Sequence, residues 1–183
     1  MTTTTTFSAT SGDVWGDTGG TIYPTNNDLV LQVNARTWIP FTITNIFHGA
    51  TIVGATLKLV AKDSQSGTAV KQKFGCEAAD NPSAPANWTE LASKTLTTAY
   101  LTDNNVAAWT DGTEYTFDIT TAVQEIIDRA GWASGNTLAV LIVDNSTTGG
   151  VRKIASYEHA TYAEPKLEIV YYNGGQFITW SSE

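Results

Sequence analysis

The chain has 183 residues, and 10 Lys and Arg against 18 Asp and Glu give it a net charge of −8 at pH 7. This length suits one domain with a substantial core, and the acidic charge disfavours nucleic acid and anionic lipid surfaces as partners. The sequence shows neither the basic start and apolar run of a secretory signal nor the roughly 18 apolar residues of a membrane span. We therefore expect a soluble protein with no nucleic-acid or membrane partner.

The first six residues are polar and repetitive, with five threonines in a row: Thr2, Thr3, Thr4, Thr5 and Thr6. Such a run has little to bury, which predicts a flexible N-terminal arm over residues 1–6. Its β-branched side chains and backbone donors suit strand addition to the sheet edge of a neighbour. We therefore regard these threonines as candidate partner contacts.

Strand-like segments, with alternating or short continuous apolar residues, follow one another through residues 7–172, which we take as one domain. Turn-rich pieces such as DSQSG, NSTTGG and YNGG separate them. The predicted strands cover residues 28–34, 37–43, 55–63, 69–77, 113–119, 137–144, 151–157 and 166–172, with a possible last one at 176–180 in a C-terminal extension, 173–183. Without a βαβ rhythm, this pattern predicts an all-β fold, an antiparallel β-sandwich.

One short helix is predicted at about residues 120–130, in the stretch ITTAVQEIIDRAGWASGN. Its apolar face comprises residues at helical spacing: Val123, Ile126, Ile127 and Ala130. A helix this short needs a larger apolar surface to lie on. Because residues 137–144 are apolar on both faces, we expect the helix to cover that strand.

The start and end of this helix are predicted from the spacing of polar residues and from a glycine. Thr121 and Gln124 have capping-box spacing, Glu125 and Arg129 are four residues apart, and Gly131 can take the left-handed conformation that stops a helix.

No catalytic pattern is visible, and we expect no enzyme. GWASGN misses the GxSxG nucleophile pattern by one position, and the two histidines, His48 and His159, are far apart in sequence. The single Cys76 lies in a strand-like run, where a small buried residue would fit. These residues predict packing and turns rather than chemistry.

No cofactor is predicted, although three loop aspartates, Asp13, Asp80 and Asp144, offer carboxylates of the kind that calcium binds. Asp in a loop more commonly caps its own turn, and this is the interpretation that we prefer.

The tryptophans divide by context. Trp38 and Trp132 lie in strand and helix-exit patterns and are expected in the core. Trp88 and Trp109 stand in polar loops, where they either anchor the loop, as we expect, or stack on a glycan. Trp15 and Trp180 lie near the two ends, and such aromatic residues often pack on a neighbour. In the C-terminal extension we expect Phe177 and Trp180 to contact a partner.

The stretch from residue 49 to 171 also carries an ordered set of motifs: HGATIVGATLKLVA, CEAADNPSAP, AWTDGTEYTFDIT, VQEIIDRAGWASGN, SYEHA and EPKLEIVY. This set resembles the DNRLRE-like jelly-roll domains, which are similar in shape to carbohydrate-binding modules. The combination is typical of short proteins of tailed bacteriophages and of repeats in large bacterial surface proteins. The resemblance implies a jelly roll with an adhesive or structural role, and it transfers no catalytic residue.

These observations together predict a virion structural protein of a tailed phage, assembled in the host cytoplasm. A capsid decoration (cement) protein is favoured over a tail or fibre component. Its partners would be the major capsid protein or another virion protein, and further copies of itself in a homo-oligomer. The alternative is a carbohydrate-binding or adhesion module that attaches the particle to glycans through Trp88 and Trp109.

Overall fold

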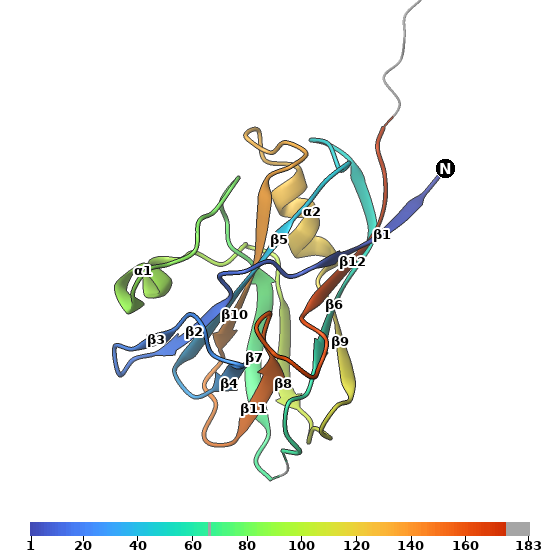
Figure 1. Ribbon diagram of the computed structural model, residues 1–183. Coiled ribbons are helices and arrows are strands. Elements are labelled where there is room, and N and C mark those ends of the chain that lie inside the picture. Colours follow the sequence, from blue (N-terminus) through green and yellow to red (C-terminus); the bar gives the residue numbers. More distant parts are fainter. Residues whose placement is uncertain (66, 175–183) are drawn as a thin grey trace, which may run out of the picture.

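The computed structural model describes residues 1–65 and 67–174, and within this part the chain is an antiparallel β-sandwich (Figure 1). In spatial order, one sheet contains β1 (Thr3–Ser8), β12 (Lys166–Tyr172), β6 (Thr51–Val60) and β9 (Glu114–Asp118). The other sheet contains β3 (Ile22–Tyr23), β2 (Val14–Asp17), β5 (Ala35–Thr42), β10 (Thr137–Asp144), β7 (Val70–Cys76) and β8 (Leu101–Val106). The predicted all-β sandwich is confirmed.

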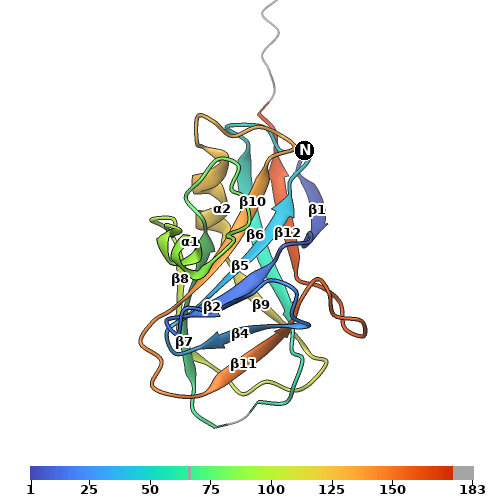
Figure 2. The same ribbon diagram turned by 60° about the vertical axis from the view of Figure 1, so that its left-hand side comes forward.

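A separate two-stranded ladder pairs β4 (Asp28–Gln32) with β11 (Val151–Ala155). Figure 2 shows this pair toward the end of the sandwich that lies away from the N-terminus. The side chain of Arg152 in β11 is completely buried, and its guanidinium donates to the backbone oxygens of Val106, Ala107 and Val151 at 2.7–2.9 Å. This arginine therefore fastens the segment that follows β8.

Every strand predicted between residues 28 and 172 is present, with its ends shifted by a few residues at most. The strands β1, β2, β3 and β8 were not predicted. β2 is short and contains a glycine, and β8 (LTDNNV) is a polar strand at a sheet edge, so neither shows the apolar alternation of a central strand. The possible strand at 176–180 lies outside the described residues.

The core lies between the two sheets and follows the period-2 rule. In β6 the side chains of Ala55, Leu57 and Leu59 point inward, while the residues between them are partly exposed. Across the gap between the sheets, the rings of Phe74 and Phe117 stack with their centroids 4.1 Å apart. Each fully buried Leu, Ile or Phe adds about 1.5–3 kcal/mol of hydrophobic stabilisation.

The helix predicted at 120–130 is present as α2 (Thr120–Ile127), and it buries its predicted residues Val123, Ile126 and Ile127. It ends earlier than predicted, and Ala130 is exposed. Its main contacts are with β6 and β7, so the prediction that it covers the outer face of β10 is wrong.

A second helix, α1 (Trp88–Ser93), was not predicted and lies on the outside of the six-stranded sheet. On this outer face Leu91 of α1 packs in one apolar cluster with Trp38 of β5 and Leu141 of β10. Asn87 caps the start of α1 by accepting from the Glu90 N–H at 3.0 Å. α1 and α2, the helices of the described part, are both far too short to cross a membrane.

The predicted ends of α2 are also wrong. The Thr121–Gln124 capping box does not form, since the Thr120 N–H is bound by the Asp118 carboxylate at 2.9 Å. Gln124 instead accepts from the Ile52 N–H at 2.7 Å and donates to the Ala50 oxygen at 3.0 Å. Gly131 is not in the left-handed region. A Cβ at Gly131 would collide with the Asp80 carboxylate, so the glycine permits a close approach rather than a turn.

The pair Glu125–Arg129 does not form either. Glu125 accepts from the backbone N–H groups of Thr98 and Ala99, at 2.9 Å each, while Arg129 pairs with Asp80. Both side chains thus tie the helix to the segment between β7 and β8.

The prediction of a flexible N-terminal arm is wrong for Thr3–Thr6. These residues belong to β1, which pairs with β12 in antiparallel register from Thr3 opposite Tyr171 to Ser8 opposite Lys166. The ring of Phe7 is buried in the core and holds the strand on its own sheet.

Ile126 provides a test of the α2 face. We expect Ile126→Asp to lower the free energy of unfolding by about 3–5 kcal/mol, because an unpaired carboxylate would replace a fully buried side chain. The matched control is Thr121→Asp, on the exposed side of the same helix, which should change it by less than about 0.5 kcal/mol. Urea unfolding followed by tryptophan fluorescence measures both, and equal midpoints would contradict the assignment.

Candidate functional site: a free sheet edge and an exposed apolar end

The predicted partner contacts Thr3–Thr6 lie on β1, at one edge of the four-stranded sheet. Thr4 and Thr6 are exposed, whereas Phe7 is buried and Thr5 is half-buried. Within the described residues no strand pairs with the outer side of β1, so its backbone N–H and C=O groups there are free to pair. Thr2 precedes the strand and is exposed.

Exposed apolar side chains from three other segments lie at the end of the four-stranded sheet where β1 starts. Phe47, before β6, is 56% exposed, and Val53 and Tyr172 are 57% and 43% exposed. The register brings them together, since Tyr172 pairs with Thr51 and Tyr171 pairs with both Ile52 and Thr3. Figure 1 shows the N-terminus and the end of β12 at the same end of the molecule. We call Phe47, Val53 and Tyr172 the exposed end.

A shift in register between Val170 and Tyr171 explains the exposure of Val53. At this bulge two residues of β6, Val53 and Gly54, occupy the space of one, so that Val53 turns outward beside Thr51. In the sequence Val53 continues the alternation of the inward-facing Ala55 and Leu57, so its outward position could not be predicted without the bulge.

The loop that carries Phe47 is well fastened. The Asn173 side chain accepts from the Phe47 N–H at 3.2 Å and donates to the Asn45 oxygen at 2.9 Å. The indole N–H of Trp132, which is buried as predicted, donates to the Ile46 oxygen at 3.1 Å. The exposed Phe47 ring is thus presented by an ordered backbone. Beside it, His48, Ala50 and Asn173 line a hollow.

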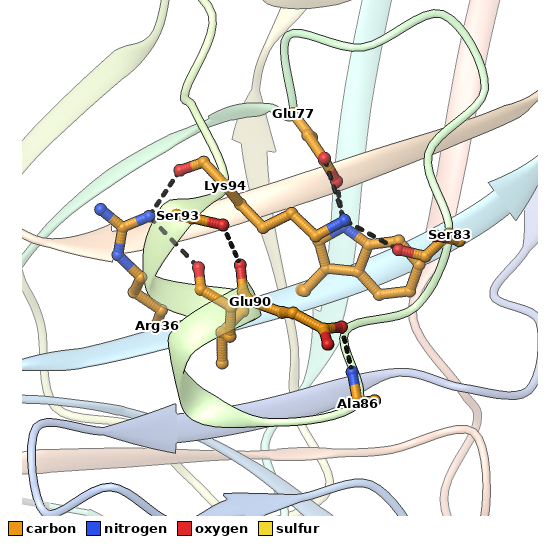
Figure 3. Close-up of polar contacts among 9 residues, drawn as sticks. Arg36, Glu77, Ser83, Ala86, Glu90, Ser93 and Lys94 are labelled. Carbon is orange, nitrogen blue, oxygen red and sulfur yellow. Dashed lines mark hydrogen bonds and ion pairs between the residues drawn. The ribbon is translucent and has the colours of Figure 1, made fainter.

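The densest polar cluster of the described residues lies elsewhere, on the outside of the six-stranded sheet (Figure 3). Glu77 accepts from the Trp38 indole N–H at 2.7 Å and pairs with the Lys94 ammonium at 3.0 Å. Lys94 also donates to the Ser83 oxygen at 2.8 Å, and Arg36 donates to the Lys94 oxygen at 2.7 Å.

This cluster is structural in character because its charged groups bind one another and the backbone. Lys94 lies over the Trp38 ring, 5.6 Å from its centroid, and follows α1 directly. The cluster therefore anchors α1 and its flanking segments on the sheet.

The candidate metal and catalytic residues do not converge. Asp80 pairs with Arg129, and Asp144 accepts from the backbone N–H groups of Thr147 and Asn34 at 2.9 and 3.0 Å. In residues 1–65 and 67–174, no group of three His, Cys, Asp or Glu side chains is placed to hold a metal ion.

The two histidines and the cysteine do not form a catalytic site in the described residues. His48 lies near α2, with Nε2 3.3 Å from the Asp128 oxygen, and His159 accepts from the N–H groups of Thr161 and Tyr162. Cys76 is buried as predicted, and burial raises the pKa of its thiol.

The tryptophans are mostly internal. Trp109 is 3% exposed and stacks on Tyr115, so its ring has no face open to a glycan. Trp88 is half-buried at the start of α1, against the cluster around Trp38.

The prediction that Trp15 packs on a neighbour is wrong, because it is buried and stacks on Tyr23 with their centroids 4.4 Å apart. Phe177 and Trp180 lie outside the described residues.

The Glu77 cluster yields a stability prediction. We expect Lys94→Met to lower the free energy of unfolding by about 2 kcal/mol, because it leaves a nearly buried Glu77 carboxylate without its cation. Lys58→Met is the matched control, since the Lys58–Glu168 pair is more exposed and its removal should cost clearly less. Chemical unfolding compares the two, and an equal loss in both would show that Lys94 is no anchor.

No protein-family model matches the chain, and no curated protein sequence matches it either. The resemblance to DNRLRE-like domains therefore stays a prediction from the sequence motifs.

Proposed function

We propose that the chain is a non-enzymatic structural protein of a tailed-phage virion, a capsid decoration protein that binds at the junctions of capsid subunits. The observation that carries the proposal is the free edge of β1, which lies beside the exposed end of Phe47, Val53 and Tyr172. This combined surface is the proposed contact with the capsid or with a further copy.

The composition of β1 supports this role. Natural proteins shield sheet edges with Lys, Pro, bulges or very short strands, because an open edge pairs with other chains. β1 runs TTTTFS over residues 3–8, with no charge and no proline, and its register with β12 is unbroken. In a chain of net charge −8, an uncharged edge also avoids repulsion from an acidic partner.

The exposed end supports the proposal through the hydrophobic effect, in addition to the hydrogen bonds of the free edge. A free edge supplies backbone hydrogen bonds, which carry little specificity, while exposed apolar side chains supply buried area. Phe47, Val53 and Tyr172 come from three separate segments at the end of the four-stranded sheet where β1 starts, and Tyr172 lies on β12, which pairs with β1. Aromatic residues are enriched at the cores of protein interfaces.

The strand order supports the jelly-roll part of the proposal. Eight strands can be taken in chain order as first to eighth: β1, β5, β6, β7, β8, β9, β10 and β12. One sheet then has the order first, eighth, third, sixth, and the other contains second, seventh, fourth, fifth. This interleaving is the arrangement of a double-sheet jelly roll.

The edge of β1 can be tested without unfolding the sandwich. We expect the double variant Thr4→Lys, Thr6→Lys to fold normally, because both side chains are exposed, but to lose at least about tenfold in occupancy, because lysines on an edge oppose strand pairing. Occupancy is the copy number on purified particles by quantitative mass spectrometry. Deleting residues 1–6 is less informative, since it removes most of a strand.

The matched control is Thr89→Lys, Thr121→Lys, which adds the same charge at exposed positions of α1 and α2. It should keep wild-type occupancy. If the wild-type protein is absent from particles or present in only a few copies, the decoration role fails.

The carbohydrate-binding alternative is tested on a glycan array. We expect no tight binder that depends on Trp88, because its ring is half-buried against the protein. A glycan whose binding is lost in Trp88→Ala, with the fold intact by circular dichroism, would favour an adhesion module instead.

A further inference from the structure

Two carboxyl groups far apart in sequence meet next to the six-stranded sheet. Asp13 directly precedes β2, and Glu158 lies in the turn that follows β11. The Tyr157 N–H donates to Asp13 Oδ2 at 2.8 Å, and the Glu158 carboxyl lies within hydrogen-bonding reach of Asp13. The contact joins the chain between β1 and β2 to the chain between β11 and β12.

These carboxyls are poorly satisfied as two anions. Asp13 is 1% exposed, and among the described residues neither its Oδ1 nor the buried Oε2 of Glu158 has a hydrogen-bond partner. Two negative charges at contact distance, shielded from water, repel each other strongly. A single proton between them would turn the repulsion into a hydrogen bond and satisfy both oxygens.

We propose that Asp13 and Glu158 share one proton and form an acid clasp, which closes when the proton is present and loosens when it leaves. The acid clasp holds the segment after β1 against the turn after β11. This inference does not depend on the proposed function, because it concerns stability and local opening.

The ionisation of Asp13 agrees with this geometry. Burial first, and then the neighbouring Glu158, raise its pKa from 3.8 to about 7, against the opposing effect of the Tyr157 N–H. Because the folded pKa lies above the unfolded value, the stabilisation is fully present below about pH 4 and is lost as the pH rises through about 7. The stabilisation by the acid clasp should therefore decrease between about pH 4 and about pH 7.

Other charged or titratable groups nearby are occupied elsewhere. His159, in the same turn, accepts from the N–H groups of Thr161 and Tyr162 through Nδ1. Asp28, next to the Asn27 oxygen that binds the Ser156 N–H, pairs with Lys62 and Lys153. The Tyr157 side chain is largely exposed. Glu158 is thus the charged group that acts on Asp13.

A proton fits the pair better than a calcium ion does. Calcium takes six to eight oxygen ligands, and the pair offers two free carboxylate oxygens. One proton needs only those two.

The test is Asp13→Asn, which imitates the protonated form. The asparagine oxygen can accept from the Tyr157 N–H while its amide donates to Glu158. We expect wild type and variant to melt at nearly the same temperature at pH 4, and the variant to melt a few degrees higher at pH 8. Hydrogen exchange of the Tyr157 amide should be slower in the variant than in wild type at pH 8 and equal in the two at pH 4.

The matched control is Asp103→Asn, which removes the same charge from a half-buried aspartate that accepts from the Asn105 N–H. It should show no pH-dependent gain. A stability difference for Asp13→Asn that is the same at both pH values would overturn the acid clasp. Calcium chloride that raises the melting temperature of wild type but not of Asp13→Asn would overturn it too, in favour of a cation site.

Discussion

The apolar layer between the two sheets is the constraint on which the rest of the structure depends. Leu57 and Leu59 of β6 and the stacked rings of Phe74 and Phe117 define which face of each strand points inward. Because side chains alternate, a slip of one residue in any central strand would turn its whole apolar set outward. β10 and β12 are paired along both edges, so a slip in either strand would disturb its pairing with two neighbours.

Segments that leave the sheets are held by buried polar side chains that bind backbone groups. Arg152 binds the Ala107 oxygen after β8, Gln124 binds the Ala50 oxygen before β6, and Trp132 binds the loop that carries Phe47. Each bond replaces a lost contact with water, so its net value is only about 1 kcal/mol, but leaving either partner unsatisfied would cost more. These ties give the loops a defined shape without a further sheet.

The proposed assembly edge and the proposed acid clasp both involve the N-terminal segment, the first through β1 and the second through the chain after it. β1 has one edge fastened to β12 and one edge free, and the acid clasp at Asp13 holds the chain that follows it. If β1 pairs with a neighbouring molecule, a pull on that molecule also acts on the pairing of β1 with β12. The Asp13–Glu158 contact, which holds the chain after β1, would oppose the separation of β1 from its own sheet. The stability of the clasp and the strength of assembly can be measured separately, because Asp13 and Thr4 lie in different segments.

The sequence by itself determined the sandwich, its central strands and the buried face of α2, because these depend on periodicity within a few neighbouring residues. Only the tertiary structure decided the partners of residues far apart. The run of threonines does not reveal that it pairs with β12. The sequence around Asp13 does not reveal that Glu158 lies beside it. Likewise, the sequence around Gly131 does not reveal that the Asp80 carboxylate occupies the space of a Cβ. The loop tryptophans follow the same rule, since the burial of Trp109 depends on Tyr115 and on the bridge to Gln65. Local pattern specifies which side of a strand is apolar, whereas the packing of distant segments specifies what covers it.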